Sequence, residues 1–120
     1  MTIGVIDDSK GICQMIKTLL ELHGYTVYTY IDPTAFATLI IPHNMLQFDC
    51  IIVDFRLPGH LTGVELIQQV RKHHPRLPAI LISAHFIPQT ILQELSGVRI
   101  LRKPFSLADL LQTIKNSQGK

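Results

Sequence analysis

The sequence predicts an α/β protein built on a doubly wound, five-stranded parallel sheet. Five short apolar runs alternate with five segments whose apolar residues recur at helical spacing, and alternating βα units form parallel sheets covered by helices. The run Cys50–Val53 is apolar throughout, which is typical of a strand buried on both faces. The chain has 120 residues and no Gly/Ser-rich linker, so we expect residues 1–120 to form one domain.

The first βα unit is expected at the start of the chain. Residues 2–6 are largely apolar and predict a strand, which the acidic pair Asp7-Asp8 ends. Ser9 suits the N-cap of the helix that follows, and Gly24 suits the position after its end. The helix is indicated by apolar residues at helical spacing, namely Ile12, Met15, Ile16, Leu19 and Leu20.

The second unit reads as a less buried strand followed by a helix. Residues 25–31 are rich in Tyr, Thr and Val and alternate in polarity, as an edge strand would. Asp32-Pro33 then supplies an N-cap and a proline at the first helical position. We expect this helix to end at Pro42.

The third unit contains the central strand, whose apolar run ends in the carboxylate of Asp54. Turn residues follow at Pro58-Gly59. Thr62 and Glu65 have the spacing of a capping box, which predicts a helix beginning there and ending before Pro75.

The last two units follow the same pattern. Residues 79–82 predict a buried strand that ends in Ser83, and a weaker helix is expected from about 88 to 95, closed by Gly97. Residues 98–101 predict the fifth strand, which Arg102, Lys103 and Pro104 follow. Ser106 is expected to cap the final helix.

Composition narrows the class of protein. The net charge is +2 and the basic clusters are short and lack interleaved aromatic residues, so we expect no nucleic-acid binding by this domain. No apolar run approaches the 18 or so residues of a membrane span, and no signal peptide is recognisable, so a cytoplasmic location without membrane association is expected. Cys13 and Cys50 lie in apolar segments and are interpreted as core residues. The six histidines show no zinc-ligand spacing.

Polar residues follow four of the five predicted strands. Asp7-Asp8, Asp54, Ser83 and Lys103 would meet at one edge of a parallel sheet, and the order 2-1-3-4-5 would bring the three carboxylates together. Three carboxylates within a few Å repel, at a cost on the order of 1–4 kcal/mol per pair. Mg²⁺, for which Mn²⁺ can substitute, is the natural counter-ion because it prefers oxygen ligands. A lysine and a hydroxyl suit an incoming phosphoryl group.

These residues resemble the receiver domain of bacterial two-component response regulators, in the CheY-like superfamily, over essentially all 120 residues. Two adjacent aspartates or a Lys-Pro pair alone would be weak signals, but here all the motifs follow the correct strands in order. The resemblance implies a flavodoxin-like (βα)₅ fold and a phosphorelay role. It also implies a phosphoprotein that phosphorylates and dephosphorylates itself without being a multiple-turnover enzyme.

The resemblance also implies roles for individual residues. A histidine kinase or histidine phosphotransfer protein would present a phosphohistidine, and Asp54 would accept the phosphoryl group as an aspartyl phosphate. The metal would be held by Asp8, by Asp7 through water, by Asp54 and by the carbonyl of Arg56. The bond before Pro104 would be cis. A downstream protein or a second copy could bind through the face of strands four and five.

Three departures from the family pattern stand out. One more residue than usual separates Asp54 from Gly63, around His60. The hydroxyl residue is Ser83, where threonine is commoner. Position 100, three before the lysine, usually holds an aromatic residue that switches between two states, and here it is Ile100, whose β-branched side chain is stiff.

Alternative interpretations remain open. The chain could be the receiver part of a longer regulator with a DNA-binding or enzymatic output domain. A phosphatase of the haloacid dehalogenase type would use a similar aspartate and Mg²⁺, but it needs a second acid where this chain has Arg56. A flavodoxin would need a hydroxyl-rich phosphate loop after strand one, where Asp7-Asp8 would repel a flavin phosphate. The cognate kinase, output pathway, oligomeric state and phosphoryl lifetime are not predictable from the sequence.

Overall fold

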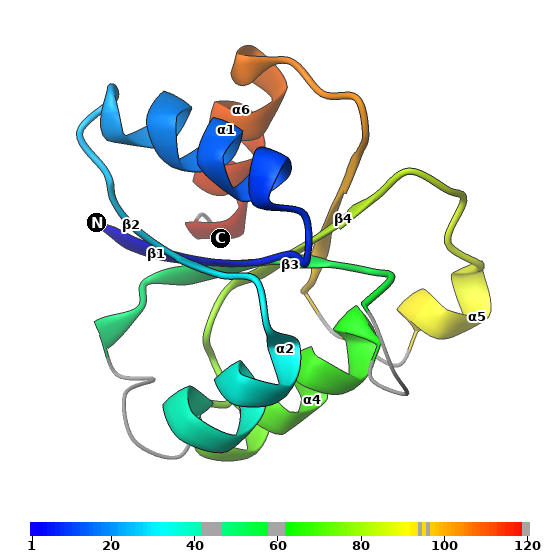
Figure 1. Ribbon diagram of the computed structural model, residues 1–120. Coiled ribbons are helices and arrows are strands. Elements are labelled where there is room, and N and C mark those ends of the chain that lie inside the picture. Colours follow the sequence, from blue (N-terminus) through cyan, green and yellow to red (C-terminus); the bar gives the residue numbers. More distant parts are fainter. Residues whose placement is uncertain (42–46, 58–61, 94, 96, 119–120) are drawn as a thin grey trace.

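Five parallel strands form one sheet in the order β2-β1-β3-β4-β5 (Figure 1). The computed structural model describes residues 1–41, 47–57, 62–93, 95 and 97–118. The strands are β1 (Thr2–Ile6), β2 (Thr26–Tyr30), β3 (Cys50–Asp54), β4 (Ala79–Ser83) and β5 (Arg99–Arg102). All four pairings are parallel, so the predicted flavodoxin-like order is confirmed, with β2 at an edge as expected.

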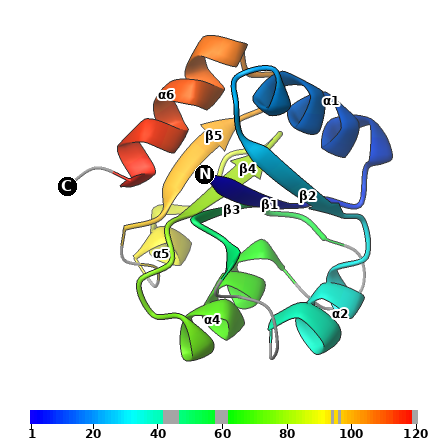
Figure 2. The same ribbon diagram turned by 90° about the vertical axis from the view of Figure 1, so that its left-hand side faces the viewer.

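Helices cover both faces of the sheet (Figures 1 and 2). One face carries α1 (Lys10–Glu21) and α6 (Leu107–Gln118), and the other carries α2 (Pro33–Ala35), the π-helical segment η1 (Phe36–Ile40), α4 (Gly63–His73) and α5 (Gln89–Leu92). Among the described residues, no helix combines the length and apolarity needed to cross a membrane.

The core is split into two clusters by the sheet, because successive side chains of a strand point to opposite faces. From β3, Ile51 and Val53 pack towards α4, whereas Cys50 and Ile52 pack towards α1 and α6. The whole of β3 is buried, as its apolar sequence predicts. This double burial fixes the central strand, and with it the position of the carboxylate at its end.

Local signals set the element boundaries. Ser9 caps α1 by accepting the N–H of Ile12, and Thr62 and Glu65 form the predicted capping box of α4. Gly24 and Gly97 adopt positive φ angles of 89° and 74°, as residues that close helices often do.

Three segments differ from the prediction in detail. The helix expected to run from Pro33 towards Pro42 has a single α-helical turn and then a π-helical stretch, in which the N–H of Ile41 donates to the carbonyl of Phe36. The weak helix expected from about 88 to 95 is shorter, as α5 (Gln89–Leu92). The fifth strand is shifted by one residue, to Arg99–Arg102, so that Lys103 directly follows it.

Candidate metal centre

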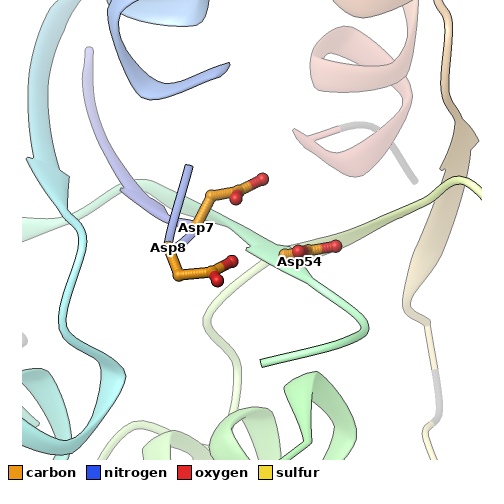
Figure 3. Close-up of side chains that lie close together, drawn as sticks. All are labelled: Asp7, Asp8 and Asp54. Atoms are coloured by element: carbon orange, nitrogen blue, oxygen red, sulfur yellow. The ribbon is translucent and has the colours of Figure 1, made fainter. Parts of the chain in front are cut away.

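Three carboxylates meet where β1 and β3 end (Figure 3). Asp7 and Asp8 directly follow β1, and Asp54 is the last residue of β3. The two strands are neighbours in the sheet, and one carboxylate oxygen from each of the three residues lies within 4.8 Å of the others. The sheet order therefore assembles the acidic cluster that the sequence predicts.

The three carboxylates differ in environment. Asp7 is fully buried, Asp54 is 8% exposed and Asp8 is exposed. Asp7 is also the most firmly held, because its Oδ1 accepts the N–H of Ser9 at 2.9 Å and its own N–H donates to the carbonyl of Tyr30 at 3.1 Å. Asp8 is consequently the member most accessible to a hydrated cation.

Lys103 lies against two of these carboxylates. Its Nζ is 3.2 Å from Asp7 Oδ2 and 3.5 Å from Asp54 Oδ1. Its backbone N–H donates to the carbonyl of Ser83 at 2.8 Å, which ties the end of β5 to the end of β4. The bond between Lys103 and Pro104 is cis, so that expectation is confirmed.

The ionised form of Asp54 is disfavoured by its surroundings, although Lys103 lies beside it. Burial raises the pKa of Asp54 above its usual value, and the negative charge of Asp7 raises that pKa further. Lys103 and a hydrogen bond from the backbone N–H of Arg56 lower the pKa without cancelling the increase. Further positive charge would therefore stabilise the ionised form of Asp54.

The donor set fits Mg²⁺. Mg–O distances are about 2.0–2.1 Å, so oxygens on opposite sides of the ion are about 4 Å apart. The 4.8 Å limit within which the oxygens of Asp7, Asp8 and Asp54 lie is slightly larger, a difference that small side-chain movements or a retained water would close. Hard carboxylate oxygens are the ligands Mg²⁺ prefers. The proposed contribution of the Arg56 carbonyl stays a prediction.

Ser83 closes the site on the side of β4. Its side chain is almost fully buried, and its Oγ donates to the carbonyl of His85 at 2.7 Å and accepts the N–H of His85 at 3.0 Å. The sequence analysis predicted that this hydroxyl binds an incoming phosphoryl group. In the structure the hydroxyl is hydrogen-bonded to the backbone of His85. To donate elsewhere, the hydroxyl must release the His85 carbonyl.

Gly63 is a site residue that the sequence analysis missed. A Cβ atom at this position would lie 2.3 Å from the carbonyl oxygen of Asp54, and the Gly63 N–H donates to the carbonyl of Phe55 at 2.9 Å. Only glycine lets the first turn of α4 approach the end of β3 so closely. The available sequence signal was a glycine directly after the N-cap Thr62, which by itself indicates no more than a helix start.

Of the departures from the family pattern noted in the sequence, one lies outside the described residues and another lies within them. The segment around His60 lies outside the described residues. Ile100 is half-buried, pairs with Leu81 of β4 and packs against the core cluster on the α4 face. Its effect on switching stays a prediction.

Comparisons with known proteins agree with this geometry. The family model described as "Response regulator receiver domain" matches residues 3–115. The transcriptional regulatory protein FixJ of Bradyrhizobium diazoefficiens is 30% identical over 103 residues, which are 84% of this chain and 48% of that protein. The chain therefore spans about half the length of this curated relative.

Solved structures show the same similarity. A response regulator receiver domain protein from Clostridium thermocellum superposes with a TM-score of 0.85 at 30% identity, covering 98% of this chain and 93% of that one. The chemotaxis protein CheY4 of Vibrio cholerae gives a TM-score of 0.83 at 27% identity, with 97% of each chain covered.

Proposed function

Because this chain belongs to the response regulator receiver domain family, we propose that it accepts a phosphoryl group on Asp54 from a phosphohistidine. The donor would be a histidine kinase or a histidine phosphotransfer protein. The observation that carries the proposal is the placement of Asp54, a nearly buried carboxylate at the end of the central strand, between an acidic pair and the ammonium of Lys103.

In the proposed transfer, a carboxylate oxygen of Asp54 attacks the phosphorus atom while the N–P bond of the phosphohistidine breaks. The electron pair of that bond stays on the imidazole, and the phosphoryl group becomes an acyl phosphate on Asp54. When bound by Asp7, Asp8 and Asp54, Mg²⁺ would neutralise negative charge on the phosphoryl oxygens. Lys103, already 3.5 Å from Asp54 Oδ1, would offset the charge that remains.

Ser83 would respond to the new group. Its hydroxyl now donates to the His85 carbonyl, and an acyl phosphate on Asp54 would offer a charged and therefore stronger acceptor. Exchange of that bond would release residues 84–86 from their present turn. We propose this loop as the first element to sense phosphorylation, ahead of β5, because Ile100 lacks the aromatic ring used by most of the family.

Water would hydrolyse the acyl phosphate and so return the protein to its resting state. No other side chain would be modified in this step. Arg56 and His85 each follow a site residue by two positions, and both side chains are exposed. We propose that Arg56 shields the phosphoryl group from water and prolongs its lifetime.

The test is intact-protein mass spectrometry after incubation with Mg²⁺ and acetyl phosphate or phosphoramidate. A single phosphoryl adduct on the wild type, absent from Asp54→Asn and retained in the exposed control Asp109→Asn, is the expected result. An adduct that survives in Asp54→Asn, for example on Ser83, would refute the assignment.

The scope of the whole protein is a separate proposal. The FixJ relative is named a transcriptional regulatory protein, and this chain matches 48% of it, so we also propose a DNA-binding or enzymatic output domain beyond residues 1–120. The length of the encoding reading frame tests this directly.

A downstream protein or a second copy would bind the face of β4 and β5. A cytoplasmic location belongs to the same proposal, since Cys13 and Cys50 are both free thiols.

A further inference from the structure

A polar cavity lies at the opposite edge of the sheet from the acidic cluster. It has a volume of about 330 Å³ and is lined mainly by the end of α4, the connection to β4, the start of β5 and the end of α6. Figure 2 is viewed from this edge. Arg71, Arg76 and Arg99 reach it from three of these elements, with Asn116 and Ser117 from α6.

The charge of this cavity is strongly one-sided. Three of the lining residues are arginines, and none of the described lining residues is acidic. The nearby carboxylate of Asp49 does not line the cavity, and its Oδ2 accepts the N–H of Thr2 at 2.7 Å. A concave site with fixed positive charge attracts anions.

The three arginines are not equally engaged. Arg99 Nη2 makes one long hydrogen bond, 3.4 Å, to the carbonyl of Asn116. Arg76 is exposed, and its guanidinium makes no hydrogen bond or ion pair within the described ranges of the chain. Arg71 is half-buried and already makes an interaction of its own, so its guanidinium is not counted as available to an anion. Arg76 and Arg99 therefore retain most of their donors.

We propose that this cavity binds a small anion bearing a phosphate group. The planar guanidinium presents paired N–H donors that match phosphate oxygens, which makes arginine better suited to this ligand than lysine. The volume is at the lower end of that of small-molecule sites, which favours inorganic phosphate, pyrophosphate or the phosphate end of a nucleotide. The site is separate from Asp54 and does not depend on the function proposed above.

A simpler interpretation is that the arginines complement the carbonyl ends of α4 and α6, since both helices end at this edge. The two interpretations differ in what an added anion does. If the guanidinium groups only face helix carbonyls, phosphate should bind no better than another anion that is added to the same ionic strength. If the cavity is a built site, phosphate should bind saturably and at these residues.

The experiment is a titration followed by amide NMR on the full 120-residue chain, with EDTA present. Inorganic phosphate, pyrophosphate and AMP are added in turn, with sodium chloride at matched ionic strength as the reference. Saturable shifts are expected around Arg76 and Arg99, without comparable shifts at Asp54 or Lys103. Tighter binding of AMP than of phosphate would point to a nucleotide as the source, and equal binding to the phosphate group alone.

The variant Arg76→Gln/Arg99→Gln should weaken phosphate binding at least tenfold. Lys72→Gln is the control matched in charge to the single variant Arg76→Gln, because it removes one positive charge from an exposed residue beside Arg71 that does not line the cavity, and it should change the affinity less than twofold. If the double variant is less stable, Arg76→Gln alone provides the test. Shifts that fail to saturate by about 20 mM, or that persist in the double variant, would overturn the proposal.

Discussion

Replacing Asp54 with asparagine should stabilise the folded protein at pH 7 when no divalent cation is present. The substitution keeps the shape of the side chain and removes one negative charge from a carboxylate that is only 8% exposed. A variant that loses the proposed function would thereby gain stability, because the wild-type carboxylate is buried beside the negative charge of Asp7.

The magnitude follows from the distances. At an effective dielectric constant of about 20, repulsion from Asp7, whose carboxylate oxygen lies within 4.8 Å, costs about 3.5 kcal/mol at that limiting distance, and attraction to Lys103 at 3.5 Å returns about 4.7 kcal/mol. Asp8 is exposed, so its repulsion is closer to the value in water, about 1 kcal/mol. These charge terms nearly cancel, and the remaining cost is the lost hydration of Asp54. We expect a net gain of about 2 kcal/mol for the variant.

The measurement is urea denaturation and thermal unfolding of both proteins with EDTA present, with Asp109→Asn as an exposed control. For a chain of this size, the expected gain corresponds to a rise in Tm of about 8 °C. Saturating Mg²⁺ should reduce or reverse the difference, because the cation stabilises only the protein that binds it well. An asparagine variant that is less stable than the wild type under EDTA would show that the attraction to Lys103 outweighs burial.

The same substitution predicts a pH dependence. The folded-state pKa of Asp54 is raised above its usual value of 3.8, so protonation of this group favours folding. That contribution is fully present below about pH 3.8 and is lost as the pH rises through the raised pKa. The stability difference between the variant and the wild type should therefore be smallest in acid and reach its full size at neutral pH. A difference that grows as the pH falls would contradict the assignment.

Four further predictions concern other residues. Gly63→Ala should lower the free energy of unfolding by more than about 3 kcal/mol in a urea titration, because its Cβ would meet a backbone carbonyl at 2.3 Å; a loss below about 1 kcal/mol would mean that the backbone moves away easily. Asp8→Ala should weaken Mg²⁺ binding more than Asp7→Ala by calorimetry, because Asp8 is the exposed carboxylate of the cluster; unchanged binding in both variants would exclude the acidic pair as the metal site. Arg56→Asn should speed loss of the phosphoryl label, and an unchanged decay rate would refute shielding. Because Ile100 is stiff, beryllofluoride should shift amides more in residues 83–91 than in residues 98–101; comparable shifts in both would contradict this.

The parts of the fold and site that the sequence predicted are those set by short-range pattern. The apolar run before Asp54 specifies a doubly buried strand, and once the strand order is known, the positions of Asp7, Asp8 and Lys103 follow from the common edge of a parallel sheet. Cap residues such as Thr62 act on their own helix, so they too can be recognised locally.

The parts that escaped prediction depend on contacts between distant segments. The sequence does not show that Gly63 lies close to the end of β3, because this contact forms only when α4 packs against the sheet. In the sequence, the arginines belong to separate short basic clusters. Only the fold brings three of them, Arg71, Arg76 and Arg99, around one cavity. The bond between Ser83 and His85 spans two residues, yet it depends on a loop geometry that the residue types do not specify.

The pairing beyond Asp54 has a consequence for the variation in length noted in the sequence. Arg56 and Thr62 form an antiparallel bridge, and the Gly63 N–H binds the carbonyl of Phe55, so the chain is clamped at both ends of the intervening segment. Lengthening a closed loop by one residue adds little entropy cost, because that cost grows only with the logarithm of loop length. The pairings on either side therefore allow the number of residues between Arg56 and Thr62 to vary without moving the carboxylate of Asp54.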